Sequence, residues 1–291
     1  MADYGSPLVP RRRLAAELAR LRKDSGLTGA QVAKQLNWST SKVSRYELAR
    51  TGLKPDDVDI LLDFYRIDGK AKEELLTLAT EAAKRGWWEA YSDVLPDELA
   101  ELIGLETEAR LALTWQIECI PGLLQTENYA SQVNRGFQEV VAMPPRAMAR
   151  RVKARLLRQQ VLTRDNPLCL SVVIDESALL RGPADPRVMR DQMEHLVEVS
   201  ALPNVTIHVL PISGSLAIIQ PSFVVLEFGD SEIGSADNLP DVAYAEHLVT
   251  NLYFEEEDDT YHYKEAYGHL AAAALSEADS TAMFAELAKR I

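Results

Sequence analysis

The chain contains 291 residues, of which 47% are hydrophobic and 26% are charged, and its formal net charge is −13. This composition is typical of a globular protein with a substantial core, and it excludes a disordered, collagen-like or coiled-coil chain. The length allows one large domain or two modest ones.

The sequence predicts neither a membrane span nor a secretory signal. The longest apolar runs, such as Leu270–Leu275, are much shorter than the roughly 20 residues of a membrane helix, and the polar start Met1–Arg13 lacks a signal-peptide core. Cys119 and Cys169 are too few and too far apart for a disulfide framework or a zinc motif. We expect a soluble cytoplasmic protein with two reduced, buried thiols.

Acidic and basic residues are unevenly distributed along the chain. Residues 1–54 hold eleven Lys and Arg against four Asp and Glu, a net charge of +7, which leaves −20 for the remainder. Counterion release can drive a basic segment onto DNA, while distant carboxylates are screened beyond about 8–10 Å at physiological salt. We therefore expect the first segment to bind nucleic acid and the acidic remainder to stay off it.

Two short, capped helices follow a longer one in this basic segment. Leu14, Leu18 and Leu21 form the apolar stripe of a helix that runs from Arg11 and stops at Ser25–Gly26. Thr28 caps the second helix, with Gln31 completing a capping box, and Ser39 caps the third. Asn37, between them, suits a left-handed backbone.

The third helix has an apolar inner face and a polar outer face. Val43 and Tyr46 form the inner face, so the hydroxyl and basic side chains of this helix point outward. Hydroxyl groups and an arginine suit the base edges of the DNA major groove. Two capped helices joined by a tight turn, with such an outer face, predict a helix-turn-helix.

The segments Leu27–Ala33 and Asn37–Glu47 resemble the DNA-binding domain of XRE-type, phage repressor and Cro-like regulators. The resemblance places base reading on four residues, which are Thr40, Ser41, Lys42 and Arg45. It places an internal structural ion pair on Arg22 and Glu47, which we interpret as fixing the third helix against the first. Gly29 stands where the family commonly has a glutamine that contacts DNA, so one expected contact is missing.

Contacts to the DNA backbone fall to a second set of residues around the same helices. Thr28, Gln31 and Lys34 can anchor the backbone in place of the missing glutamine, and further phosphate contacts follow the third helix. The complete predicted set is Thr28, Gln31, Lys34, Ser39, Ser44, Arg50, Thr51 and Lys54.

Two further helices, at 55–65 and 70–84, complete a mainly α, five-helix lambda-repressor-like domain over residues 1–85. Helical periodicity lapses from Gly86 until Glu98, so we place a second domain over 86–291. Trp87 and Trp88 at this boundary form either a hinge packed against the second domain or an aromatic platform for a ligand or a partner.

The acidic remainder mixes strands and helices. Strands are expected at 109–117, 168–174, 205–210, 223–228, 242–245 and 251–254, and helices from Thr126 and at 144–162, 186–200, 260–275 and 280–290. This order predicts an α+β domain with a mostly antiparallel sheet. The cationic helix at 144–162 either contacts DNA or an acidic partner, or neutralises carboxylates of its own domain.

Candidate catalytic and metal-binding groups are weak in this half of the chain. Adjacent Asp175 and Glu176 diverge in direction, and Glu176 more naturally starts a helix. His262, Glu265 and His269 share one helical face, but no cysteine or second histidine pair supports a metal site. Phosphate loops, dinucleotide fingerprints and nucleophile elbows are absent from the sequence. We expect no enzyme activity, no metal and no cofactor.

A second resemblance covers residues 11 to about 290. It rests on motifs that are specific in combination, namely Gly86–Trp88, Glu106–Ala109, Ile120–Thr126 with Tyr129-Ala130, Arg155 with Arg158-Gln159, Asp175-Glu176, and Pro203–Ile207 with Val209–Pro211. These motifs resemble actinomycete XRE-type regulators with an uncharacterised, antitoxin-like C-terminal domain, including the WhiJ type. The resemblance implies transcriptional control coupled to a small protein encoded beside the regulator.

These observations predict a sequence-specific DNA-binding regulator, a repressor or antitoxin-like protein that is nucleoid-associated when bound. One recognition helix reads only a few base pairs, so we expect a homodimer on a palindromic operator, with half-sites about 34 Å apart. The alternatives are a regulator that senses a small molecule near Trp87, Trp88 or Trp115, and an enzyme with an appended DNA-binding domain.

Overall fold

The chain forms two compact units in the computed structural model, which describes residues 6–49, 53–138, 143–182, 185–213, 221–229, 240–247 and 251–291. The first unit consists mainly of Met1–Glu89, and the second contains Ala90–Phe228 and Pro240–Ile291. Each unit has its own hydrophobic core.

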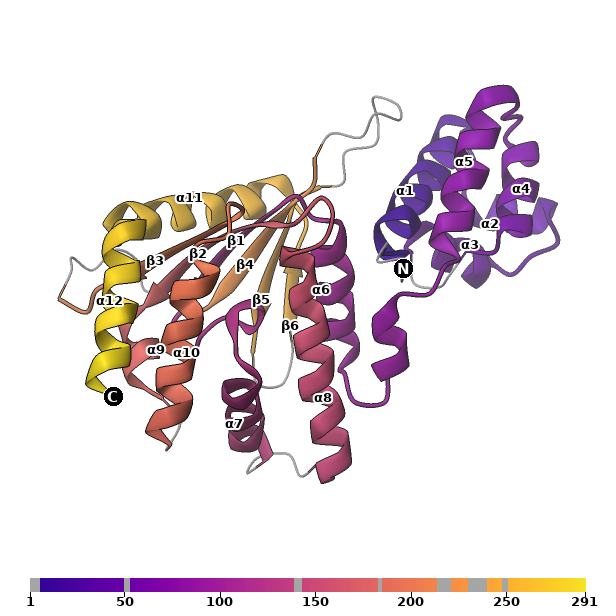
Figure 1. Ribbon diagram of the computed structural model, residues 1–291. Helices are drawn as coiled ribbons and strands as arrows, with labels where there is room; N and C mark the ends of the chain where they lie inside the picture. The colour runs from indigo at the N-terminus through magenta and orange to yellow at the C-terminus, as the bar shows by residue number, and fades with distance from the viewer. Residues whose placement is uncertain are drawn as a thin grey trace. The chain divides into compact units, whose positions relative to one another are not determined.

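The first unit is a bundle of helices (Figure 1), namely α1 Leu8–Asp24, α2 Gly29–Gln35, α3 Thr40–Glu47, α4 Pro55–Phe64 and α5 Gly69–Ala82. Its core is built from the predicted apolar stripes, and Leu14, Val32 and Leu62 are fully buried. Asn37 has a φ of 56°, which confirms the left-handed turn predicted between α2 and α3. Gly26, with a φ of 67°, ends α1 in the same conformation.

The second unit is built on a six-stranded mixed sheet in the order β3-β2-β1-β4-β5-β6. The strands are β1 Leu111–Gln116, β2 Cys169–Asp175, β3 Val205–Leu210, β4 Phe223–Glu227, β5 Val242–Glu246 and β6 Asn251–Phe254. β1, β2 and β3 run parallel, while the β1–β4, β4–β5 and β5–β6 pairs are antiparallel. The predicted α+β class with a mostly antiparallel sheet is confirmed.

Helices cover both faces of this sheet. They are α6 Asp97–Glu108, α7 Glu127–Gln138, α8 Pro145–Arg158, α9 Glu176–Leu180, α10 Pro186–Val199, α11 Glu257–Ala273 and α12 Glu277–Arg290, with the short 3-10 helices η2 Gly122–Leu124 and η3 Gln159–Leu162. A further 3-10 helix, η1 Trp87–Tyr91, spans the boundary between the two units. α11 lies along one face, while α6, α8 and α10 lie on the other (Figure 1). The α11 Tyr267 hydroxyl donates to Ser171 Oγ of β2 at 2.8 Å, which anchors this helix over Trp115 and Val173.

The two cysteines are less buried than the sequence indicated. Cys169 is exposed and Cys119 is partly buried. Cys169 is the first residue of β2 and lies opposite Leu111, the first residue of β1. Leu111 is also partly exposed, so this end of the two strands is accessible to solvent. Among the described helices, none combines the length and the apolar character that crossing a bilayer requires.

The free edge of β3 is covered by the connection between α11 and α12. The Leu275 N–H donates to the Val209 carbonyl at 2.8 Å, and Ser280 Oγ accepts from the Val209 N–H at 3.0 Å. His208 Nδ1 lies 2.9 Å from the Leu275 carbonyl. Backbone groups that an edge strand leaves open are thereby satisfied within the chain.

A buried ion pair joins α6 to α8. Arg158 donates from Nε and Nη2 to the two carboxylate oxygens of Glu106, both at 2.5 Å, and the two side chains are 13% and 2% exposed. Burial alone would lower the pKa of Arg158, but Glu106 raises it above its ordinary value. Neither charge can lose its partner without leaving the other one buried and uncompensated.

We expect Glu106→Gln to destabilise the second unit by about 3–5 kcal/mol, because Arg158 then remains charged and buried without its carboxylate. Amide hydrogen exchange in β1, β2 and β4 measures this unit alone. Asp93→Asn is the matched control, because Asp93 pairs with Arg150 at the surface and its side chain is 58% exposed, so its loss should change stability by less than about 1 kcal/mol. Equal losses in both variants would contradict a structural role for the buried pair.

Candidate nucleic-acid interface

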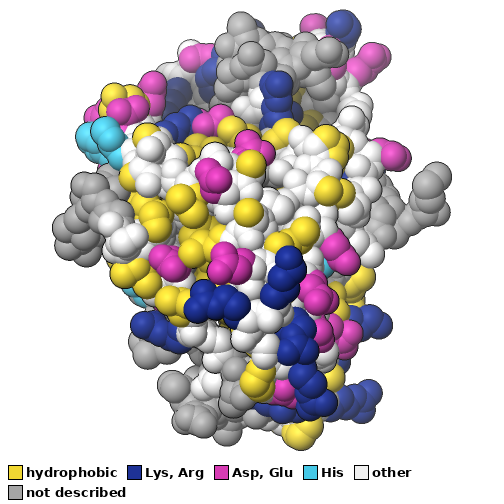
Figure 2. Space-filling view, turned by 60° about the vertical axis from the view of Figure 1, so that its left-hand side comes forward, with side chains coloured by type: hydrophobic (Ala, Val, Ile, Leu, Met, Phe, Trp, Pro, Cys, Tyr) yellow, Lys and Arg dark blue, Asp and Glu magenta, His cyan; other side chains and the backbone are white. Residues whose placement is uncertain are grey.

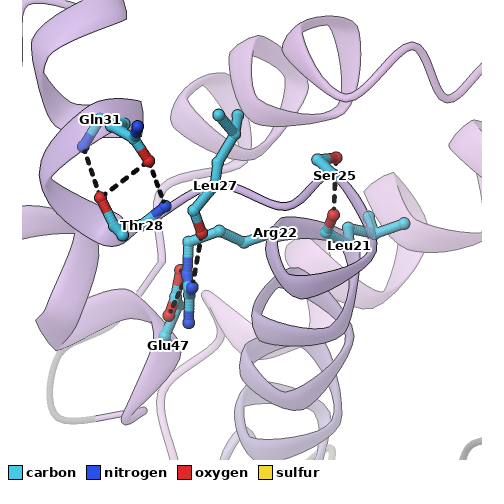
Figure 3. Close-up of polar contacts among 7 residues, drawn as sticks. All are labelled: Leu21, Arg22, Ser25, Leu27, Thr28, Gln31 and Glu47. Atoms are coloured by element: carbon cyan, nitrogen blue, oxygen red, sulfur yellow. Dashed lines mark hydrogen bonds and ion pairs between the residues drawn. The ribbon is translucent and has the colours of Figure 1, made fainter.

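α3 is fixed to α1 by an ion pair between Glu47 and Arg22, and Arg22 also contacts the residue just before the N-cap of α2 (Figure 3). Arg22 Nε donates to the Glu47 carboxylate at 2.7 and 2.9 Å, and Arg22 Nη1 donates to the Leu27 carbonyl at 2.8 Å. Both side chains are largely buried, and the hydrogen bond to Glu47 raises the pKa of Arg22. One guanidinium therefore ties together the three elements of the helix-turn-helix.

The predicted capping box at the start of α2 is present. Thr28 Oγ1 accepts from the Gln31 N–H at 3.3 Å, and Gln31 Oε1 accepts from the Thr28 N–H at 2.8 Å (Figure 3). The side chains of Thr28, Gln31 and Lys34 are exposed. Gln31 uses its carbonyl oxygen in the cap, which leaves its amide nitrogen to donate to a phosphate.

The outward face of α3 carries hydroxyl groups and one guanidinium. Ser39 caps the helix by accepting from the Lys42 N–H at 3.2 Å. Arg45 Nε donates to the Ser41 carbonyl one turn back at 3.2 Å, and no described residue accepts from its two Nη groups. The exposed residues of this face are Ser39, Thr40, Ser41, Ser44 and Arg45, all of them from the predicted DNA-contacting set.

Lys42, predicted to read bases, is held inside the unit. Its Nζ lies 2.7 Å from Asp57 Oδ1 and 3.7 Å from the centre of the Trp38 ring. Its side chain is 27% exposed. The spacing of Trp38 and Lys42, one turn apart, is the only sequence signal for this stacking, and Asp57 comes from a later helix. We therefore leave Lys42 out of the base-reading set.

Asp57 connects α4 to α3 through two donors. Besides Lys42, the Tyr46 hydroxyl donates to Asp57 Oδ2 at 2.5 Å. Burial alone would raise the pKa of Asp57, but the hydrogen bonds from Lys42 and Tyr46 hold it below its ordinary value. Burial and the negative charge of Asp57 both raise the pKa of Tyr46. The inner side of α3 is thus packed through Val43 and Tyr46, and the contacts of Lys42 and Tyr46 with Asp57 hold it against α4.

The remaining predicted residues occupy different environments. Lys54 is exposed just before α4, whereas Arg50 and Thr51 lie outside the described residues. Gly29 leaves space for a side chain, because an added Cβ would meet Val43 Cγ1 at an ordinary 3.8 Å. Packing therefore does not require a glycine at this position.

Of the three tryptophans near which a ligand or partner site was predicted, Trp87 and Trp88 belong to the first unit and Trp115 belongs to the second. Trp115 is 1% exposed and lies in the core beneath α11. Trp88 is buried, and Trp87 meets it edge to face with ring centres 6.0 Å apart. An alternating strand pattern does not reveal which face of the sheet a helix will cover, so the burial of Trp115 could not be predicted from the sequence.

The cationic helix α8 uses several of its charges within its own unit. Arg150 pairs with Asp93, and Arg158 pairs with Glu106. The prediction that this helix neutralises carboxylates of its own domain is confirmed for these two residues. Figure 2 shows one face of the molecule, on which Lys and Arg lie among Asp, Glu and apolar side chains rather than forming a uniformly basic surface.

Among the described residues, no group of three or more His, Cys, Asp or Glu side chains could hold a metal ion. Asp175 Oδ1 accepts from the Ser177 N–H and caps α9, and Glu176 Oε2 accepts from the Ile212 N–H. Both carboxylates therefore have structural partners.

These helices and their exposed polar face define a DNA-binding regulator of the helix-turn-helix class. Residues 13–75 match the family model described as a helix-turn-helix domain. Residues 99–286 match the model described as domain of unknown function DUF5753, which covers more than half of the chain, and the chain therefore belongs to the DUF5753 family. Neither a curated protein nor a solved structure matches the chain.

Acid should weaken the first unit through Asp57. A carboxylate whose folded pKa is lowered stabilises the fold above its ordinary pKa of 3.8, and this contribution is lost as the pH falls through the folded value. At neutral pH we expect Asp57→Asn to lower stability by about 1.5–3 kcal/mol. The difference between wild type and variant should shrink on acidification.

Thermal unfolding between about pH 7 and pH 3 measures this difference. Asp63→Asn serves as the control, because its side chain is 66% exposed and Lys72 keeps a second carboxylate, Asp59. A pH-independent difference for Asp57→Asn would refute the ion pair as its cause.

Proposed function

We propose that the chain is a sequence-specific transcriptional repressor of the XRE type that binds a palindromic operator as a homodimer. The proposal rests mainly on one observation, the exposed hydroxyl and guanidinium face of α3 held rigidly by the Arg22–Glu47 and Lys42–Asp57 pairs. A fixed helix that presents donors and acceptors is what major-groove readout requires.

In this proposal Arg45, Thr40 and Ser41 contact bases. Arg45 is the principal reader, because its planar fork can donate twice to the O6 and N7 edge of guanine. The contacts to the DNA backbone come from the residues around α2 and α3, namely Thr28, Gln31, Lys34, Ser39, Ser44, Arg50, Thr51 and Lys54. Residues 1–85 form the DNA-binding domain, and 86–291 form the domain for dimerisation and regulation.

We expect Arg45→Ala to weaken specific operator binding by about 1–3 kcal/mol, roughly 5- to 160-fold, and to relax base preference at one position per half-site. Selection of binding sites from random DNA, followed by mobility-shift titration, measures both effects. Footprints should show two half-sites one helical turn apart.

Arg20→Ala is the matched control for this measurement. Arg20 is an exposed arginine of α1 that pairs with Glu17 and Asp24, and it lies outside the proposed DNA-contacting set. Its removal should leave operator affinity within about 0.5 kcal/mol of wild type. Unchanged affinity in Arg45→Ala would remove Arg45 from the recognition surface.

The regulatory signal in our proposal is an antitoxin-like interaction between residues 86–291 and a small protein encoded beside the regulator. Two exposed apolar side chains of the second unit support such a surface. Leu180 ends α9 and is 60% exposed, and Ile212 is 61% exposed. The Ile212 N–H donates at 2.8 Å to the side chain of Glu176, which is the first residue of α9. This bond places the side chains of Ile212 and Leu180 in one region of the surface.

Leu180→Glu combined with Ile212→Glu should weaken binding of the purified neighbour-encoded protein at least tenfold, because a charge then replaces apolar contact area. Calorimetry measures this affinity, and operator titration with and without the small protein measures its effect on DNA binding. Tyr261→Glu is the control, since Tyr261 is 56% exposed on α11 at the other face of the sheet. A small protein that leaves wild-type operator affinity unchanged would refute the regulatory role.

A further inference from the structure

The Lys42 ammonium lies in a closed cluster of side chains from the turn before α3, from α3 itself and from α4. Its Nζ is 2.7 Å from Asp57 Oδ1, 3.7 Å from the centre of the Trp38 ring and 5.6 Å from the centre of the Tyr46 ring. The two rings meet edge to face with their centres 6.1 Å apart. A carboxylate and two aromatic faces, each of which attracts a cation, therefore hold this lysine within the first unit.

The position of Lys42 on α3 is nevertheless one from which a lysine can reach DNA. Lys42 directly follows exposed Ser41 and precedes exposed Arg45 by three residues, so it lies at the flank of the outward face. A helix in the major groove has a phosphate backbone on each side, and the flexible stem of a lysine allows a phosphate contact on any sequence. A Lys42 side chain released from the cluster would emerge beside Arg45, toward such a phosphate.

Asp57 is well placed to compete with a phosphate for this cation. It is the third residue of α4, in the first helical turn, where the helix dipole favours a negative charge. Its second oxygen accepts from the Tyr46 hydroxyl at 2.5 Å. The side chains of Asp57 and Lys42 are only 16% and 27% exposed, so solvent and salt screen their attraction less than that of a surface pair.

Arg45, the other cation of α3, is held differently. Its Nε donates to the Ser41 carbonyl on the same helix at 3.2 Å, and its side chain is exposed. This bond leaves the two Nη groups of the guanidinium directed away from the helix backbone. The two cations of one short helix thus have opposite environments, one committed to a carboxylate and one open to solvent.

We propose that Asp57 keeps Lys42 away from DNA phosphates, so that α3 meets DNA with Arg45 as its uncommitted cation. This inference rests on the proposed binding of DNA by α3, and it assigns a role to a residue outside the contact surface. Phosphate contacts add affinity for every sequence, whereas base contacts carry the sequence information. Holding Lys42 back therefore lowers the sequence-independent affinity and leaves base contacts a larger share of operator binding.

The experiment is an anisotropy titration of a random-sequence DNA duplex with the full chain, repeated between about 50 and 200 mM KCl. Asp57→Asn should release Lys42 to one further phosphate. The slope of log affinity against log salt should then steepen by about 0.9, and the affinity near 0.1 M salt should rise roughly 5- to 10-fold. A purely structural role of Asp57 predicts the opposite, because a partly unfolded unit binds DNA more weakly.

Two further variants separate the release of Lys42 from a general change of charge. Lys42→Met should leave the wild-type slope unchanged, and combined with Asp57→Asn it should cancel the gain. Asp56→Asn is the matched control, because Asp56 is the exposed neighbour of Asp57 and pairs with no cation in the described part of the chain. It removes the same charge without releasing a lysine, and should change the slope by less than about 0.3.

An unchanged slope in Asp57→Asn, an equal gain in Asp56→Asn, or a flatter slope in Lys42→Met would each overturn the inference. Where Asp57→Asn does not fold, Lys42→Met decides alone, since a flatter slope would show that Lys42 contacts phosphates in the wild-type protein. The random duplex needs no operator, so these slopes are measured separately from the operator binding that tests the proposed function.

Discussion

The helix-turn-helix depends on the contact between Arg22 and Glu47. α2 and α3 contain seven and eight residues, too short to be stable on their own. The Arg22 guanidinium reaches the end of α3 and the carbonyl of Leu27 just before α2, so it sets the angle between the two helices as well as the distance. A recognition helix that is mobile in the free protein loses conformational entropy when it binds an operator, which weakens binding. The Arg22–Glu47 contact orders the helix in the free protein and so lowers this entropic cost.

Local signals in the sequence are sufficient for much of the first unit. Caps at Thr28 and Ser39, and the left-handed Asn37, depend on neighbours within four residues and formed as expected. Lys42 shows the limit of that reasoning, because its environment is decided by Asp57, fifteen residues later. A position that faces outward on an isolated helix can be covered once the next helix packs.

In the second unit the missed features are those that depend on tertiary packing. Helical periodicity resumes at Glu98, near the start of α6, but this pattern does not reveal that residues 102–107 of the helix, including Glu106 and Thr107, are all buried. The exposure of Cys169 and the burial of Trp115 depend on where α11 crosses the sheet, which periodicity along a strand does not record. The sequence motifs Glu106–Ala109, Ile120–Thr126 and Arg155 to Gln159, in contrast, acquire a physical meaning. They supply the buried hydrogen bonds that hold α6 and the loop after β1 against α8 and the turn that follows it.

The closure of the β3 edge by the α11–α12 connection links the integrity of the sheet to the last part of the chain. Removing α12 would take away Ser280 and expose the Val209 N–H on a strand whose inner residues are Val, Ile and Leu. Such a strand is a template for pairing with another molecule. α12 therefore protects the β3 edge from pairing with other molecules. Forms of the protein that lack α12 would be expected to aggregate even where the DNA-binding helices remain folded.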